Sequence, residues 1–122
     1  MVYLDNCATT KVDKDCSQLA LSCMVEDFGN PSSPYYVGAK AFDAINNARS
    51  KAAMVIASKA TDIYFTPSGT YSNNLAIIGS AKANPSKKHI VTTAIEHDSV
   101  LKPCEFLKTQ GYNIDIVQPN KN

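Results

Sequence analysis

The sequence predicts an α/β fold built from crossover units on a parallel sheet. Three segments, residues 63–66, 89–93 and 112–117, are rich in residues that favour strands. Helical patterns lie between them, and strand–helix–strand alternation is typical of right-handed crossovers between parallel strands. With 122 residues, 44% of them hydrophobic, the chain can bury the core of one domain. Three strands with only part of their helical cover would leave sheet edges and apolar surface open.

The first elements are expected to be two helices separated by a loop. Asp13 can cap a helix over about residues 14–27. A second helix is expected over about residues 38–57. The breaker-rich run at 29–34, Gly-Asn-Pro-Ser-Ser-Pro, predicts a loop between them. Each helix has one apolar face, formed by Cys16, Leu19, Ala20, Cys23 and Met24 in the first and by Ala41, Ile45, Ala48, Ala52 and Val55 in the second.

From residue 63 onward, the expected elements alternate between strands and helices. After the strand at 63–66, a helix is expected from about residue 72 to 83, followed by the strand at 89–93. Asp98 or Ser99 can cap the next helix, which would end near residue 110. Gly111 suits the position just past that end. The last strand, 112–117, alternates apolar and polar residues.

Two polar segments fall at the carboxyl ends of predicted strands, where open α/β sheets bind ligands. In residues 67–74, a turn at Gly69 opens a helix, and its N–H groups and dipole could bind a phosphate. The hydroxyls of Ser68, Thr70 and Ser72 could add hydrogen bonds or serve only as helix caps. In residues 92–98, His97 would lie at the same edge, in either a functional or a structural role.

Composition argues against several other classes of protein. The formal net charge is +1 and lysines are interspersed with acids, so neither nucleic acid nor an anionic membrane is an expected partner. No apolar run is long enough to span a bilayer, and the first residues lack the pattern of a secretory signal. A cytoplasmic or organelle-matrix location is therefore expected. The four cysteines lack metal-site spacing, so no metal site is expected.

Five blocks of sequence resemble the cysteine desulfurases, which are pyridoxal-phosphate enzymes of the class V aminotransferase group. The blocks are residues 3–10, 28–33 with Gly38, 65–77, 89–93 and 96–101. They cover nearly all of this chain but only roughly the first third of the family's length. The resemblance implies a partial PLP-transferase fold (fold type I, aspartate-aminotransferase-like) with an incomplete large domain. Residues 1–37 would belong to the small domain and residues 38–122 to the first part of the large, cofactor-binding domain.

The same resemblance implies a cofactor, pyridoxal 5′-phosphate, and roles for particular residues. Gly69 and Thr70 would bind its phosphate, and His97 would stack on its pyridine ring and act as the catalytic residue by assisting proton transfer. Ala8 and Thr9 would lie on the substrate side. The block at residues 65–77 departs from the usual family pattern at Pro67, which lacks a backbone N–H, and at Tyr71, which replaces an acid.

In complete form, such an enzyme would convert L-cysteine to L-alanine and a protein-bound persulfide for iron–sulfur cluster assembly. It would be a homodimer and could deliver sulfur to an iron–sulfur scaffold protein. The chemistry needs a Schiff-base lysine, an acid paired with the pyridine nitrogen and a mobile cysteine. In the family all three lie downstream of this region, so the chain alone is expected to be inactive. Two alternatives stay open: a selenocysteine lyase of the same group, and a non-catalytic remnant that acts as a binding module.

Overall fold

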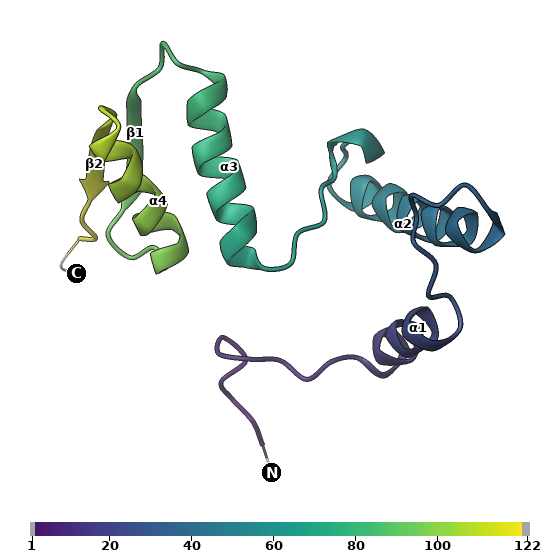
Figure 1. The fold of residues 1–122 in the computed structure, drawn as a ribbon. Coiled ribbons are helices and arrows are strands. Elements are labelled where there is room, and N and C mark those ends of the chain that lie inside the picture. Colours follow the sequence, from purple (N-terminus) through teal and green to yellow (C-terminus); the bar gives the residue numbers. More distant parts are fainter. Residues whose placement is uncertain (1, 121–122) are drawn as a thin grey trace. The chain divides into compact units, whose positions relative to one another are not determined.

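The computed structural model describes residues 2–120, which form one compact unit that ends at Tyr64 and a second that begins at Phe65. Figure 1 shows the elements in chain order. They are α1 (Lys14–Val25), α2 (Tyr36–Val55), the 3₁₀ turn η1 (Ala60–Asp62), α3 (Gly69–Ala83), β1 (His89–Thr93), α4 (Asp98–Thr109) and β2 (Asn113–Val117). Within the described part of the chain, no helix is both long and apolar enough to cross a membrane.

Helix α1 begins where the sequence predicts. The Asp13 carboxylate accepts hydrogen bonds from the N–H of Asp15 at 2.9 Å and of Cys16 at 3.3 Å, so the predicted cap is confirmed. The predicted apolar stripe is not packed, because no residue of α1 is buried. Leu19 and Met24, for example, are 67% and 69% exposed. The pattern therefore predicted the helix correctly but not a covering partner within the described residues.

Helix α2 packs closely against the loop that precedes it. A Cβ atom at Gly38 would lie 2.3 Å from the carbonyl oxygen of Ser33 and 2.7 Å from that of Asn30. Only glycine allows this approach, and Gly38 and Ala53 are the buried residues of the helix. Lys40 pairs with Asp27 just before the loop, and this contact raises the pKa of the Lys40 ammonium group. The expected apolar face is only partly covered.

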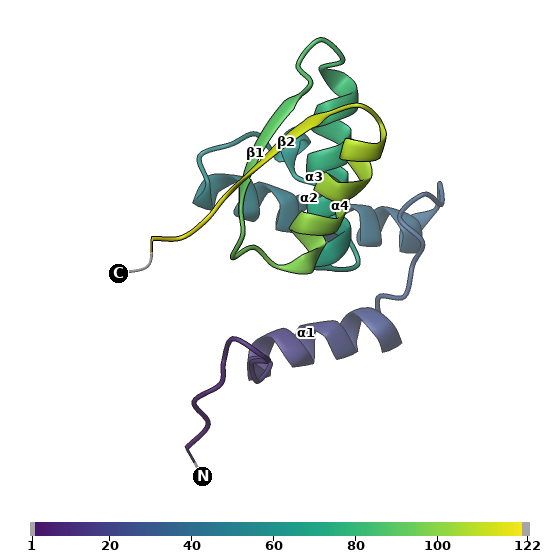
Figure 2. The same ribbon diagram turned by 90° about the vertical axis from the view of Figure 1, so that its left-hand side faces the viewer.

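The second unit contains the predicted parallel crossover. Strands β1 and β2 pair in parallel, from His89 opposite Asn113 to Thr93 opposite Val117. Helix α4 connects the two strands, and Figure 2 shows α3 and α4 behind the sheet, on the same face. The prediction of a parallel sheet in an α/β fold is confirmed.

The predicted strand at 63–66 is wrong. The described sheet consists of β1 and β2 and does not include this segment. A strand is defined by a ladder of backbone hydrogen bonds to a neighbouring strand, and strand-favouring residues alone do not supply that ladder. The backbone N–H of Ile63 instead bonds to the carbonyl of Ala60, and the Thr66 hydroxyl donates to the Ser68 carbonyl at 3.1 Å. The segment is therefore an irregular connection between η1 and α3.

The second unit has a small core under α4. Leu107 is 1% exposed and Cys104 is 3% exposed. The Tyr112 hydroxyl donates to the Ala81 carbonyl at 2.9 Å and so connects the start of β2 to the end of α3. The outer face of the sheet is uncovered, with Val91 61% and Val117 52% exposed. The expectation of open apolar surface is thus confirmed.

Cysteine alkylation tests this packing. Burial raises the pKa of the Cys104 thiol, whereas Cys7, Cys16 and Cys23 are exposed. Because the thiolate is the reactive form, iodoacetamide near pH 8 should modify the three exposed cysteines well before Cys104, as peptide mass spectrometry would show. In denaturant all four should react at similar rates. Equal rates without denaturant would contradict the packing of α4.

Candidate functional site

The start of α3 presents unpaired backbone donors. Ser68 caps the helix, because its hydroxyl oxygen accepts from the N–H of Tyr71 at 3.1 Å and its carbonyl accepts from the N–H of Ser72 at 3.0 Å. Among the described residues, nothing accepts from the N–H groups of Gly69 and Thr70. Two free N–H groups at the positive end of a helix dipole are suited to bind an anion.

The Gly69 position is open, in contrast to that of Gly38. A Cβ atom added to Gly69 would meet no other atom within 4 Å. Packing within this chain therefore does not require a glycine here. Close approach of a ligand to the backbone is a separate reason for glycine, and it agrees with the free N–H groups beside it.

Of the three hydroxyls predicted as possible donors to a phosphate at this turn, the structure leaves one available. The Ser72 hydroxyl bonds to Thr66 and to the Ser68 carbonyl, and the Ser68 oxygen is used by the helix cap. The Thr70 hydroxyl is exposed and has no hydrogen-bond partner in the described part of the chain. Ser68 and Ser72 therefore shape the turn, whereas Thr70 can reach a ligand.

His97 lies at the start of α4 and caps it. Its Nδ1 accepts from the N–H of Ser99 at 3.1 Å, so the expectation that Asp98 or Ser99 would be the cap is wrong. Asp98 is instead the first residue of the helix, where a carboxylate suits the helix dipole. The His97 side chain is exposed at this position.

A pair of side-chain hydrogen bonds connects the two helix starts. Asn73 on α3 donates from Nδ2 to the Ser99 hydroxyl at 2.8 Å, and that hydroxyl lies 2.9 Å from Nδ1 of His97. Both starts lie at the carboxyl end of the strands, as Figure 1 shows. The structure therefore brings the turn at Gly69 and the imidazole of His97 to one edge of the second unit. No sequence pattern indicates the roles of Asn73 and Ser99, because their contact joins residues far apart in the chain.

Ala8 and Thr9, the residues predicted on the substrate side, are exposed in a turn of the first unit. The N–H of Ala8 donates to the carbonyl of Asp5 at 3.1 Å. Their role beside a substrate stays a prediction, as does the division of the chain at residues 37 and 38.

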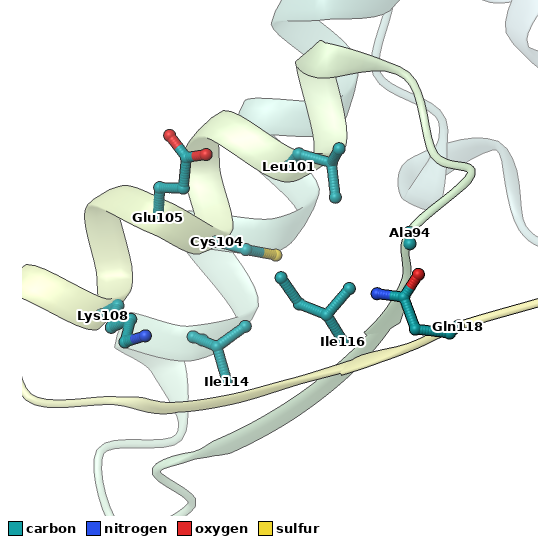
Figure 3. A pocket seen from close by; sticks show the side chains of 8 residues that line it. All are labelled: Ala94, Leu101, Cys104, Glu105, Lys108, Ile114, Ile116 and Gln118. Carbon is teal, nitrogen blue, oxygen red and sulfur yellow. The ribbon is translucent and has the colours of Figure 1, made fainter.

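A hollow lies between α4 and β2 (Figure 3). It has a volume of about 420 Å³, and the Cys104 sulfur lies among apolar side chains such as Ile114 and Ile116. Apolar residues make up most of its lining, and Glu105, Lys108 and Gln118 add polar side chains. None of the residues predicted for the site lies there. It is the incompletely covered interior of the helix–strand layer. Within residues 2–120, no cluster of three or more His, Cys, Asp or Glu side chains is placed to hold a metal.

The profile of the family described as Aminotransferase class-V matches residues 2–122. The chain belongs to this family. It is 47% identical over 121 residues to the cysteine desulfurase IscS of Methanosarcina thermophila, covering 98% of this chain and 30% of that protein. It is 40% identical over 121 residues to the cysteine desulfurase NifS of Azotobacter vinelandii, with the same two coverages. The chain thus spans about 30% of the length of the curated relatives that it matches.

Solved structures agree with this assignment. A NifS-like protein superposes with a TM-score of 0.89 at 34% identity, over 95% of this chain and 32% of its own. A structure of SspA in complex with cysteine gives a TM-score of 0.89 at 34% identity, over 97% and 34%. The chain therefore has part of the fold of a PLP-dependent NifS-like enzyme. Membership of the family implies pyridoxal 5′-phosphate as the cofactor, and two free N–H groups beside a free hydroxyl are donors that fit a phosphate.

The free donors of α3 can be tested with phosphate ligands. Inorganic phosphate and pyridoxal phosphate should shift the amide NMR signals of Gly69 and Thr70, whereas pyridoxal, which lacks the phosphate, should not. Thr70→Val removes one hydrogen bond to a charged group, so the affinity should fall about tenfold or more. Thr61→Val, an exposed threonine of the first unit, is the matched control. Equal responses to pyridoxal and pyridoxal phosphate would contradict this assignment.

Proposed function

We propose that the chain is the N-terminal part of a PLP-dependent cysteine desulfurase. In complete form the enzyme converts L-cysteine to L-alanine and a protein-bound persulfide, which supplies iron–sulfur cluster assembly. The observation that carries the proposal is that the free donors of α3 and the imidazole of His97 lie at one edge of the second unit, bridged by Ser99. Relatives with the name cysteine desulfurase at 47% and 40% identity support it.

Each site residue has a role in this proposal. Gly69 and Thr70 bind the cofactor phosphate through N–H groups and the Thr70 hydroxyl. His97 stacks its imidazole on the pyridine ring and moves a proton as the catalytic residue. Ala8 and Thr9 line the substrate side. When bound, pyridoxal phosphate supplies the electron sink that carbanion chemistry at the amino acid requires.

The chain alone is proposed to be inactive, because nothing in residues 2–120 identifies a covalent anchor for the cofactor. The lysines that the structure describes in the second unit, Lys82, Lys87, Lys88, Lys102 and Lys108, are all exposed. A lysine must lose its proton to act as a nucleophile, and Glu105, 3.0 Å from Lys102, raises the pKa of that ammonium group. The buried Cys104 has a raised pKa, the opposite of what a reactive sulfur needs.

The remaining parts of the proposal rest on the sequence alone. Residues 1–37 belong to the small domain and residues 38–122 to the large domain. The complete enzyme is a homodimer in the cytoplasm or an organelle matrix, with L-cysteine as substrate and an iron–sulfur scaffold protein as sulfur acceptor. A selenocysteine lyase would share these features, so the choice of substrate has to be measured.

The function is tested by comparing two polypeptides: the 122-residue chain, and the product of the reading frame read on past the codon for Asn122. With pyridoxal phosphate and L-cysteine, we expect alanine from the longer product and none from the shorter. Borohydride reduction and mass spectrometry should show a covalent cofactor adduct only on the longer one. Alanine or an adduct from the short chain would contradict the proposal. Turnover of L-selenocysteine but not L-cysteine by the longer product would favour the lyase.

A further inference from the structure

We propose that Asn73 and Ser99 are positioning residues, which hold the imidazole of His97 in the tautomer with its proton on Nε2. This inference rests on the proposed function, because it gives those two residues a purpose only if His97 faces a ligand. Neither residue touches that ligand in the proposal. They act by fixing the ring that does.

The backbone favours one tautomer of the His97 ring. A backbone N–H can only donate, and the N–H of Ser99 points at Nδ1 of His97 over 3.1 Å. This contact favours the neutral tautomer in which Nδ1 offers its lone pair and Nε2 carries the hydrogen. Among the described residues, Nε2 of His97 has no hydrogen-bond partner. The Nε2–H group is thus available to another molecule.

The side chains strengthen the same arrangement. The amide nitrogen of Asn73 donates to the Ser99 oxygen at 2.8 Å, which leaves the hydroxyl hydrogen of Ser99 to point at Nδ1 of His97 over 2.9 Å. Ser99 is 8% exposed, and a hydroxyl that is this buried needs partners. Both its acceptor and its donor capacity are used here, so the network is satisfied in one direction only.

The network also connects His97 to the turn that is proposed to bind an anion. Thr70 and Asn73 are three residues apart on α3, and such residues are neighbours on a helix surface. The Asn73 side chain then reaches across to α4, which begins at the His97 cap. A ligand with a phosphate at Thr70 and a flat ring at His97 would find both groups already oriented. Such preorganisation reduces the ordering cost of binding.

NMR of the imidazole nitrogens tests this without cofactor or activity. In the ¹⁵N-labelled 122-residue chain near pH 8, long-range ¹H–¹⁵N spectra should show an unprotonated Nδ1 and a protonated Nε2 for His97. Asn73→Ala and Ser99→Ala should each move the two nitrogen shifts toward each other, as the tautomers begin to exchange. Asn74→Ala is the matched control: its amide donates to the Thr70 carbonyl, outside the network, so the His97 shifts should stay unchanged.

The outcomes separate the alternatives. A wild-type ring with averaged nitrogens, or with its proton on Nδ1, would overturn the positioning role, as would two folded variants that both keep the wild-type pattern. Protection of Cys104 from alkylation shows that α4 is folded, and if a variant loses it, the wild-type spectrum decides alone. Pyridoxal phosphate is then added to the wild-type chain. If the ring keeps one tautomer but its signals do not respond to the cofactor, the positioning role is supported and the proposed function is contradicted. If the ring nitrogens are averaged but the chain binds the cofactor, the positioning role is contradicted and the proposed function is supported.

Discussion

The hydrogen bond between Asn73 and Ser99 is the contact on which the site depends. It joins residues 26 positions apart and connects α3 to α4 close to the N-termini of both helices. Neither helix start alone indicates a binding site, because a helix start with free N–H groups is common, and so is an exposed histidine. Because one amide and one buried hydroxyl bridge the helices, the turn at Gly69 and the imidazole of His97 form a single arrangement at one edge of the second unit.

The capping residues of α3 and α4 have different additional roles. Ser68 caps α3 with a short hydroxyl that pairs with the N–H of Tyr71 and leaves the first two N–H groups of the helix free. His97 caps α4 with a ring nitrogen, so the cap that stabilises the helix also orients the ring. A serine in its place could cap the helix equally well but would present no aromatic face. Under the proposed function, the ring at position 97 therefore serves both the helix and the ligand.

Local patterns predicted most of the fold, and tertiary contacts explain where they failed. The Asp13 cap, the parallel strands and the turn at Gly111, whose φ is +82°, follow from short-range rules and are confirmed. The strand expected at 63–66 needed a partner strand that the described residues do not supply. The turn at Gly69 and His97 could be proposed from their place after strands. Their connection through Ser99 could not, because no sequence pattern specifies a side-chain bond between two helices.

The most direct measurement is an isotope-filtered NOE spectrum of the labelled chain with unlabelled pyridoxal phosphate. It reports which protein protons lie near the pyridine ring of the coenzyme. The account predicts contacts from that ring to the imidazole protons of His97. Contacts only to residues elsewhere, such as the side chains around Cys104 between α4 and β2, would contradict it.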